Sequence, residues 1–443
     1  MCTCAQGLLP FIILWLCPAN HGSTATFMMR NHRHGENWAI PRFPVFAAVL
    51  VRLTLALAAG CVVLSAQTEP VGASSVLAQA GLTVAPYLQV LSPESIALLW
   101  QTDQPAYGWV DYGETKALGL KQDSVVNGLR RANVTEHRVV LTELRPGTTY
   151  WYRVVYKPIL FFAAYKVEFG PERSLELRSF QTLPTPQQPV SAVIFNDLHN
   201  NLETFRQLRQ TLGDTPFDFT LFNGDCFADP STEKTSRAIL SALTQGVQAD
   251  SHPAFFLRGN HETRGAFARD LPRFFAWPAD KPYFAFTAGP VRWVVIDCGE
   301  DKPDNHAEYF GLVDFTSFRN EETAWLKQEL ASRSFRQARW HVVVHHLPIY
   351  ARPEQGRPPE PYQVLWDRLL AKARIDLEIT AHTHHAAFFP AKSIGKPYPT
   401  VVGGNPDPTG ATVLVLEADR RQLKLRTLNA EGHNVFPAFI KRK

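Results

Sequence analysis

Cysteine is scarce in this sequence, and the positions of the few that occur exclude a fold held together by disulfides. Only six occur among 443 residues, and four of them fall within the first 61. Cys226 and Cys298 are the two in the rest of the chain, and two cysteines cannot supply a disulfide framework for so long a chain. We expect both to be buried free thiols, with a single bridge between them as the alternative.

Charged residues are also sparse, at 19% of the chain against 45% apolar residues. This balance is typical of a globular protein with a sizeable core. The formal net charge is only +4, and basic residues do not cluster except at the C-terminal Lys441–Lys443. A nucleic-acid-binding surface usually shows clustered Lys and Arg, so the composition indicates no nucleic-acid partner.

Apolar runs long enough to cross a membrane are missing, since a spanning helix needs about 20 such residues. Two shorter runs lie near the N-terminus, at Leu8–Leu16 and Leu53–Leu64. Arginines precede the second run and small residues follow it, which is the pattern of a secretory signal. We therefore expect residues 1–66 to be a targeting segment and the protein to be exported, to the periplasm or the cell exterior.

Two points about this targeting segment stay open. Met28 and Met29 stand just before its basic part, so we interpret residues 1–27 as a mis-assigned start. The alternative to a cleaved signal is an uncleaved anchor or a lipoprotein form, because Ala59-Gly60-Cys61 resembles the end of a lipoprotein signal. In that alternative, the N-terminal anchor is the only membrane contact that the sequence indicates.

The stretch after the targeting segment has the texture of an all-β domain. Residues 67–81 are small and polar, which indicates a linker. Between residues 82 and 183, short runs of β-branched and aromatic residues alternate with turn-forming segments, which predicts a β-sandwich. The expected strands are Leu82–Leu88, Ser95–Gln101, Tyr107–Tyr112, His137–Leu141, Tyr150–Tyr156 and Leu175–Thr182.

One segment of this all-β stretch has a familiar pattern. Leu144–Tyr152 reads Leu-Arg-Pro-Gly-Thr-Thr-Tyr-Trp-Tyr, and Ile96–Trp100 has the character of an inner strand. The first segment resembles the part of fibronectin type III-like domains that carries the tyrosine corner. The resemblance implies that residues 82–183 form a fibronectin-like sandwich with Trp100 in its core. It does not explain the apolar insert Lys157–Phe169.

Three prolines mark a second linker at residues 184–189, after which the pattern changes. Residues 190–443 alternate apolar strands with helices, which predicts a layered α/β domain. The expected strands are Val190–Phe195, Phe217–Phe222, Ala254–Leu257, Val291–Ile296, Trp340–Val344 and Ile375–Thr380. The expected helices are Leu202–Leu212, Thr232–Leu243, Glu322–Leu330 and Tyr362–Leu370.

Short polar clusters follow five of these strands. The loops beyond strand C-termini in α/β folds converge on one site, and Asp, His and Asn side chains are metal ligands by type. One such cluster alone is more often a solvated turn or a polar strand edge, but five in order predict a metal site. The clusters are Asp197-Leu198-His199, Gly224-Asp225, Gly259-Asn260-His261-Glu262, His345-His346-Leu347-Pro348 and His382-Thr383-His384.

The order of these motifs resembles that of the calcineurin-like metallophosphoesterases, among them the purple acid phosphatases. The resemblance covers about Val190–Gly404. It implies a four-layer β-sandwich flanked by helices, and purple acid phosphatases often carry a fibronectin-like domain at the N-terminus. It also implies an enzyme that hydrolyses a small phosphorylated substrate, with hydroxide generated by two metal ions such as Fe, Mn or Zn.

The resemblance also implies a role for each residue of the motifs. His261 would be catalytic, stabilising charge on the phosphoryl oxygens or protonating the leaving group. The other residues would hold two metal ions: Asp197, His199 and His384 one ion, Asn260, His346 and His382 the other, and Asp225 both.

Two positions depart from the family pattern. Ala228 stands three residues after Asp225, where purple enzymes place a tyrosine ligand. We therefore expect no iron–tyrosinate colour, with His199 supplying a ligand instead. Ala381 stands where the last motif usually begins with Gly, which tolerates backbone angles that Ala does not.

Other residues near the motifs need a choice between roles. His345 and His346 are adjacent, and strand alternation sends them to opposite faces, so only one can be a ligand. The His-x-Pro pattern of the family selects His346. Arg264 is a candidate for binding a phosphate oxygen, and a surface salt bridge is the equally open alternative. We expect Asp229 and His306 to be exposed loop residues, with a place at the border of the pocket as the alternative.

The predicted function is hydrolysis of phosphate monoesters. A phosphodiesterase with the same site is the close alternative, because the ligand set does not distinguish the two. A secreted adhesive or glycan-binding protein with a structural metal site is the alternative from another class, disfavoured because the full residue set is present. That set lies between Asp197 and His384, so we expect the fibronectin-like domain to be a scaffold.

Overall fold

The computed structural model describes residues 80–349 and 359–443, which belong to one compact unit, Thr68–Lys443. The predicted targeting segment and most of the linker at residues 67–81 lie outside the described residues. Among the residues that are described, no helix is long and apolar enough to cross a membrane.

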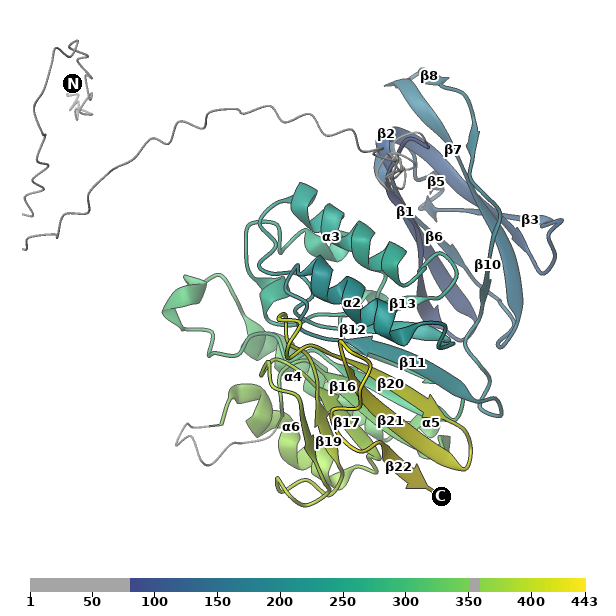
Figure 1. Cartoon of the computed structure of the whole chain (residues 1–443). Helices are drawn as coiled ribbons and strands as arrows, with labels where there is room; N and C mark the ends of the chain where they lie inside the picture. Colours follow the sequence, from purple (N-terminus) through teal and green to yellow (C-terminus); the bar gives the residue numbers. More distant parts are fainter. Residues whose placement is uncertain (1–79, 350–358) are drawn as a thin grey trace, which may run out of the picture. The chain divides into compact units, whose positions relative to one another are not determined.

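The first part of the described chain is an antiparallel eight-stranded sheet with the order β1-β2-β7-β10 (Figure 1). Strands β3 and β6 branch from β2, and β8 and β9 branch from β7. A separate two-stranded ribbon is formed by β4 and β5. The bounds are β1 Leu82–Ser92, β2 Ser95–Gly113, β3 Leu120–Asp123, β4 Val125–Val126, β5 Leu129–Arg130, β6 Val134–Leu141, β7 Thr149–Ala163, β8 Lys166–Phe169, β9 Arg173–Ser174 and β10 Arg178–Gln181.

Strand β2 joins two segments that the sequence predicted as separate strands, Ser95–Gln101 and Tyr107–Tyr112. A register shift between Gln101 and Ala106 lies where β2 changes its neighbours. Its first half pairs with β1 and β6, and its second half pairs with β3 and β7. The backbone stays extended because β2 passes from one set of neighbours to the next within the same sheet.

The core of this first sheet contains the expected tryptophan. Trp100 is fully buried, and its ring stacks on His137 with the ring centroids 4.9 Å apart. The backbone N–H of Arg145 donates a hydrogen bond to the Tyr150 hydroxyl at 3.0 Å. This contact ties β7 to the loop before it, in the way that a tyrosine corner does.

The second part of the described chain contains two six-stranded sheets (Figure 1). Their strand orders are β13-β12-β11-β20-β21-β22 and β14-β15-β16-β17-β19-β18. Phe219 on β12 packs edge-on against Phe286 and Trp293 of the other sheet, so the two sheets face each other. The bounds are β11 Val190–Phe195, β12 Phe219–Asn223, β13 Ala254–Leu257, β14 Phe284–Ala288, β15 Val291–Ile296, β16 Trp340–His345, β17 Leu377–Thr380, β18 Ala387–Phe389, β19 Thr400–Val402, β20 Thr412–Ala418, β21 Gln422–Asn429 and β22 Phe439–Arg442.

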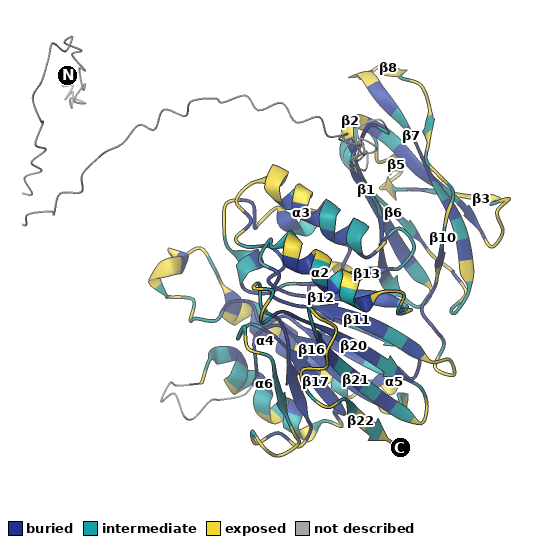
Figure 2. Ribbon diagram, viewed as in Figure 1, coloured by how far each residue is buried: buried dark blue, intermediate teal, exposed yellow. Residues whose placement is uncertain are grey.

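Helices cover the outer faces of these two sheets, which gives the mixed α/β fold that the sequence predicted. Helices α2 and α3 lie along the six-stranded sheet that contains β11, and α4 and α6 lie along the six-stranded sheet that contains β16 (Figures 1 and 2). Asn201 and Thr232 cap the N-termini of α2 and α3 by accepting backbone hydrogen bonds. The bounds are α2 Leu202–Leu212, α3 Glu233–Gly246, α4 Phe315–Leu330, α5 Arg333–Gln337 and α6 Pro361–Lys372, with short 3-10 turns at His261–Thr263, Leu271–Phe274, Pro278–Asp280 and Ala307–Tyr309.

The strands that precede the polar clusters run parallel to one another within each sheet. β11, β12 and β13 are parallel neighbours in one six-stranded sheet, and β16 and β17 are parallel neighbours in the other. Parallel strands place their carboxyl ends at one edge of a sheet, where ligands bind in open α/β folds. Both sheets therefore contribute loops to a single site.

The eight-stranded sheet packs directly on the second part of the chain. The Tyr87 hydroxyl donates to the Phe274 carbonyl at 2.6 Å, and the Tyr152 hydroxyl donates to the Asp250 carbonyl at 2.7 Å. The backbone N–H of Leu88 donates to the Ala249 carbonyl at 2.7 Å. β1 thus forms most of this contact, and the insert Lys157–Phe169, which extends β7 and returns as β8, does not appear in these hydrogen bonds.

We expect Tyr87→Phe to lower the free energy of unfolding by about 1–3 kcal/mol, because the buried Phe274 carbonyl loses its donor. Equilibrium denaturation in urea, followed by tryptophan fluorescence, measures this change. Tyr165→Phe is the matched control, because the Tyr165 side chain is fully exposed and its hydroxyl carries no such contact. Equal midpoints for the two variants would contradict a stabilising role for the Tyr87 contact.

Candidate metal centre

The loops after the parallel strands hold five of the predicted metal ligands in an uncommon backbone conformation. Their φ angles lie between 44° and 70°, in the left-handed region that side chains other than glycine avoid. Such strain persists where the surrounding structure enforces it, and it gathers at functional sites. The five residues are Asp197, His199, Asp225, His382 and His384.

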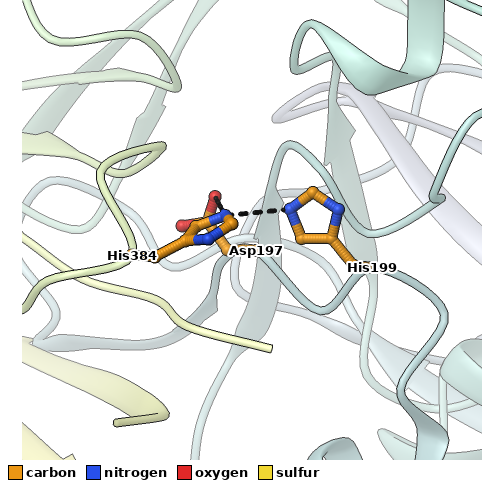
Figure 3. A group of neighbouring side chains, drawn as sticks. All are labelled: Asp197, His199 and His384. Carbon is orange, nitrogen blue, oxygen red and sulfur yellow. Dashed lines mark hydrogen bonds and ion pairs between the residues drawn. The ribbon is translucent and has the colours of Figure 1, made fainter. Parts of the chain in front are cut away.

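Asp197, His199 and His384 converge from the ends of β11 and β17 (Figure 3). The Nε2 atoms of the two histidines are 3.1 Å apart, and His384 Nε2 lies 3.6 Å from Asp197 Oδ1. Both carboxylate oxygens of Asp197 accept from the backbone N–H of His382 at 3.1 Å. The ligand atoms of these three side chains lie within 4.8 Å of one another, which is close enough to hold one metal ion.

Asp225, His346 and His382 form a second group with ligand atoms within 4.8 Å of one another. His346 Nε2 lies 3.0 Å from Asp225 Oδ2. His199 Nε2, which belongs to the first group, lies 3.6 Å from the same Asp225 oxygen. Asp225 Oδ2 therefore lies between the two groups, where a carboxylate shared by two ions would have to be.

Two buried atoms of this centre indicate that its residues fit a metal ion. Asn260 Oδ1 is buried with no hydrogen-bond partner among the described residues, and His346 Nε2 faces Asp225 Oδ2 at 3.0 Å. His346 Nδ1 lies 2.9 Å from the Asn223 carbonyl, a contact that places a proton on Nδ1 and leaves Nε2 as the ring atom that can bind a metal ion once it has lost its proton. An unpaired buried acceptor is costly, and a bound cation would satisfy Asn260 Oδ1 and replace the proton of His346 Nε2.

The charges in the centre also fit a cation. Burial raises the pKa of the Asp197 carboxyl to about 8 and lowers the pKa of the His199 and His382 imidazoles to about 4. Neutral imidazoles keep the lone pair that ligation requires. For His346, the negative charges of Asp225 and Asp197 outweigh burial and raise the pKa to about 10. The carboxylates of the centre thus favour a positive charge among them.

Glu262 is a buried residue of the third motif to which the sequence assigned no role. Its carboxylate accepts three backbone hydrogen bonds, from the N–H groups of Asp225 at 2.9 Å, Gly259 at 2.8 Å and Phe227 at 3.0 Å. Burial and the charge of Asp225 raise its pKa to about 7. Glu262 therefore ties the loop that carries Asp225 to the loop that carries Asn260.

His261, the predicted catalytic residue, lies beside Asp225. Its backbone N–H donates to Asp225 Oδ1 at 2.9 Å, and its Nε2 is 4.0 Å from Asp225 Oδ2. Its Nδ1 lies 3.0 Å from Asp229 Oδ1, which fixes the orientation of the ring. Asp229 is an exposed loop residue, as expected, but it also makes this contact. His261 belongs to a third ligand group with His199 and Asp225, so its geometry also permits ligation.

His345 lies apart from the candidate metal groups. Its Nε2 is 3.0 Å from Glu378 Oε1, and its Nδ1 contacts the Leu347 carbonyl at 2.8 Å. The neighbouring His346 turns toward Asp225, so the structure separates the two histidines as strand alternation predicts. Ala381 does not adopt a positive φ, and its N–H donates to the His346 carbonyl at 2.9 Å, so its methyl group is accommodated.

Arg264 forms an ion-pair cluster beside the centre. Its guanidinium donates to Glu300 at 2.9 and 2.8 Å and to Asp301 at 3.2 Å. Phosphate binding by Arg264 therefore stays a prediction, with its charge engaged by two carboxylates. His306 is a partly exposed residue whose Nδ1 accepts from the Glu308 N–H at 3.4 Å.

Asp301 is a further residue that the sequence did not single out. Its Oδ2 lies 4.0 Å from His382 Nε2, and burial is offset by Lys302, His382 and Arg264, which lower the pKa of its carboxyl. The segment Asp297–Asp301 follows the apolar strand β15, which is the same pattern as in the five recognised motifs. A sixth polar cluster after a strand was the signal that could have found it.

Both cysteines of the second part are buried free thiols, as the sequence predicted. The Cys226 Sγ contacts the Gly224 carbonyl at 3.7 Å, and burial raises the pKa of its thiol. A protonated thiol is a poor metal ligand. Cys226 is therefore a buried packing residue next to Asp225.

Comparison with known proteins relates the part of the chain that holds this site to a described protein family. Residues 191–386 match the family described as Calcineurin-like phosphoesterase. The chain carries a calcineurin-like phosphoesterase domain. This match spans every motif from Asp197 to His384.

Individual relatives support the same assignment. Acid phosphatase type 7 from Mus musculus is 25% identical over 325 residues, which cover 66% of this chain and 67% of that protein. Purple acid phosphatase 21 from Arabidopsis thaliana is 24% identical over 264 residues, covering 56% of this chain and 52% of that protein. A purple acid phosphatase from yellow lupin (Lupinus luteus) seeds shares the fold, with a TM-score of 0.59 at 17% identity over 81% of this chain and 74% of that one.

These comparisons support assignment of the chain as a metal-dependent phosphoester hydrolase. Purple acid phosphatase relatives imply a dinuclear metal centre, and the grouped side chains of the calcineurin-like phosphoesterase domain supply candidate ligands for it.

We expect His346→Ala to lose one metal ion per chain and more than about a hundredfold in kcat, because His346 Nε2 is a buried candidate ligand atom. Even the loss of outer contacts to metal ligands costs about 10–100-fold in affinity. His345→Ala should keep its metal content but lower the free energy of unfolding by about 1–3 kcal/mol, since Glu378 loses a buried partner. Elemental analysis and urea denaturation separate the two effects. The reversed pattern would exchange the roles of the two histidines.

We expect Glu262→Gln to lower metal affinity by about 10–100-fold and the free energy of unfolding by about 1–3 kcal/mol. The amide nitrogen of Gln would face backbone N–H donors, which cannot donate to it. Metal titration with the apo protein measures the first effect. Glu308→Gln, at a carboxylate that is 60% exposed, is the matched control. Unchanged metal affinity in Glu262→Gln would contradict a link between the two loops and the metal centre.

Proposed function

We propose that the protein is an exported phosphatase that hydrolyses phosphate monoesters at a dinuclear metal centre. One observation carries this proposal: the loops of two facing sheets bring seven Asp and His side chains together in three groups that could hold metal ions. The unpaired buried Asn260 Oδ1 beside these groups supports cation binding there.

The candidate ligands would divide between two metal ions. Two ions held there would supply Lewis-acid stabilisation of the phosphoryl oxygens and would acidify water near neutral pH. Asp225 would be the shared ligand, because its Oδ2 faces His346 in one group and His199 in the other. Asp197, His199 and His384 would hold one ion, and Asn260, His346 and His382 would hold the other. Iron, manganese and zinc all suit this mixed oxygen and nitrogen donor set.

His261 acts on the substrate from the open side of the centre. Its side chain is 25% exposed, so a phosphate ester can reach Nε2. Asp229 accepts a hydrogen bond from Nδ1, so the remaining ring nitrogen can hold or release a proton at the leaving oxygen. An imidazole directed in this way also stabilises negative charge that develops on the phosphoryl group.

In this proposal the eight-stranded sheet belongs to a fibronectin-like scaffold domain at residues 82–183. The catalytic domain spans residues 190–443. The Tyr150 contact to Arg145 and the buried Trp100 support this assignment. None of the proposed site residues comes from it. Export rests on the N-terminal pattern of residues 1–66, which the sequence alone supports.

The proposal is tested with Asp225→Ala and His261→Ala. Asp225→Ala should lose at least one ion per chain and all measurable hydrolysis, because that carboxylate is the one shared ligand. His261→Ala should keep both ions and lose about 10²–10⁴-fold in kcat, the usual size of an acid–base contribution. Asp214→Ala, at an exposed carboxylate outside the centre, is the control.

The preference for monoesters or diesters is measured with the same purified proteins. We expect kcat/KM for 4-nitrophenyl phosphate to exceed that for bis(4-nitrophenyl) phosphate by more than about tenfold, which is roughly 1.4 kcal/mol in the barrier. A preference for the diester would replace the proposal with a phosphodiesterase. Metal-replete protein without activity on any ester would favour the binding-protein alternative.

A further inference from the structure

The hairpin formed by the end of β7 and by β8 exposes a continuous run of apolar side chains. All residues from Leu160 to Phe169 are exposed, and Figure 2 shows exposed residues at the tip of this hairpin. A contiguous apolar surface of this kind marks an interaction site in most proteins. The exposed apolar side chains are Leu160 at 64%, Phe161 at 47%, Phe162 at 52%, Tyr165 at 103%, Val167 at 39% and Phe169 at 49%.

The hairpin is exposed on both of its faces. From Thr149 to Val154, strand β7 alternates between buried and less buried positions, as expected for a strand with one face on a core, and from Val155 to Ile159 all positions except Lys157 are buried. Beyond Ile159 every position of β7 is exposed, so side chains on both faces lie in water. A protein partner with one docking surface would cover one face and leave the other in water. A lipid layer into which the hairpin inserts would surround it and cover both faces.

The charges of the hairpin are paired within it. Lys166 forms an ion pair with Glu168, and Lys157 Nζ lies 3.4 Å from Glu172 Oε2. Surface attraction by these charges is therefore weak, because each lysine has a neighbouring carboxylate. An apolar tip with aromatic side chains and balanced charges is suited to the boundary between headgroups and acyl chains of a bilayer, where Phe and Leu insert and Tyr keeps its hydroxyl in the polar layer.

The base of the hairpin lies next to the point where the preceding segment joins the fold. The Tyr156 hydroxyl on β7 donates to the Ala80 carbonyl and contacts the Gly81 carbonyl at 3.3 Å. In the alternative of an uncleaved anchor, the residues before Ala80 keep the apolar run Leu53–Leu64, which would lie in a membrane. The exposed hairpin and the attachment of this segment thus belong to the same end of the first sheet.

We propose that the β7–β8 hairpin is a membrane-docking element that inserts Leu160, Phe161, Phe162 and Tyr165 into the outer layer of a lipid bilayer. Its attachment is driven by apolar burial and not by charge. The hairpin holds the phosphoesterase domain at a membrane surface without taking part in hydrolysis.

Vesicle flotation with the full chain tests this proposal. The parent protein should float with phosphatidylcholine vesicles, and raising the salt concentration should change the bound fraction by less than twofold, since apolar contacts are not screened. The triple variant Phe161→Ser, Phe162→Ser, Tyr165→Ser should lower the bound fraction at least tenfold and leave kcat unchanged. Leu120→Ser, Leu129→Ser is the matched control, at residues 54% and 76% exposed in the same part of the chain.

Two results of the flotation experiment would overturn the proposal. The first is a triple variant that floats as well as the parent, which would assign any binding to the residues before Ala80. The second is binding that requires anionic lipid and disappears in salt, which would assign it to surface charge.

A crosslinking experiment identifies the occupant of the hairpin directly. A photoreactive p-benzoylphenylalanine placed at Tyr165 should yield lipid adducts on vesicles, detected by mass spectrometry, and the same group at Leu129 should not. Crosslinks from position 165 to a second copy of the chain, with no lipid adduct, would overturn the proposal in favour of self-association.

Discussion

The carboxylate of Glu262 is the contact on which the geometry of the centre depends. It accepts backbone hydrogen bonds from the loop after β12 and from the loop after β13, which are also joined by the Phe267 N–H on the Pro230 carbonyl and by the contact of His261 with Asp229. Hydrogen bonds to backbone fix the path of the chain and not merely a side chain. They therefore hold Asp225 and Asn260 in place before any ion binds. The left-handed backbone at Asp225 is part of the path that this carboxylate enforces.

Electrostatics in the centre follow from the same crowding of carboxylates. Burial raises the pKa of Asp197, and the carboxylates of Asp225 and Asp197 raise the pKa of His346, so both groups bind protons more tightly than they do in water. Ionised carboxylates in a protein interior need a counter-charge. Protons can supply it, and a bound cation would replace them. Ion binding and proton release are linked for that reason.

Sequence patterns predicted the elements that are continuous apolar runs. β11, β13, β15 and α2 have the bounds that the sequence indicated, because polar or turn-forming residues end each run. The length of β2 was missed, because it depends on neighbours that are distant in the chain. At the site, the order of motifs found the candidate ligands, and the structure brings them together. The sequence did not predict the roles of Glu262 and Asp301, because their contacts join loops that come together only in the folded chain.

The position of β11 has a consequence for how the enzyme is made. β11 lies between β12 and β20, so the strand that leads to Asp197 has a neighbour at Thr412–Ala418, close to the end of the chain. During synthesis from the N-terminus, this sheet cannot close until β20 has left the ribosome. The loop that carries Asp197 therefore gains its full support only after more than 200 further residues have been made, and stable metal loading must wait for them.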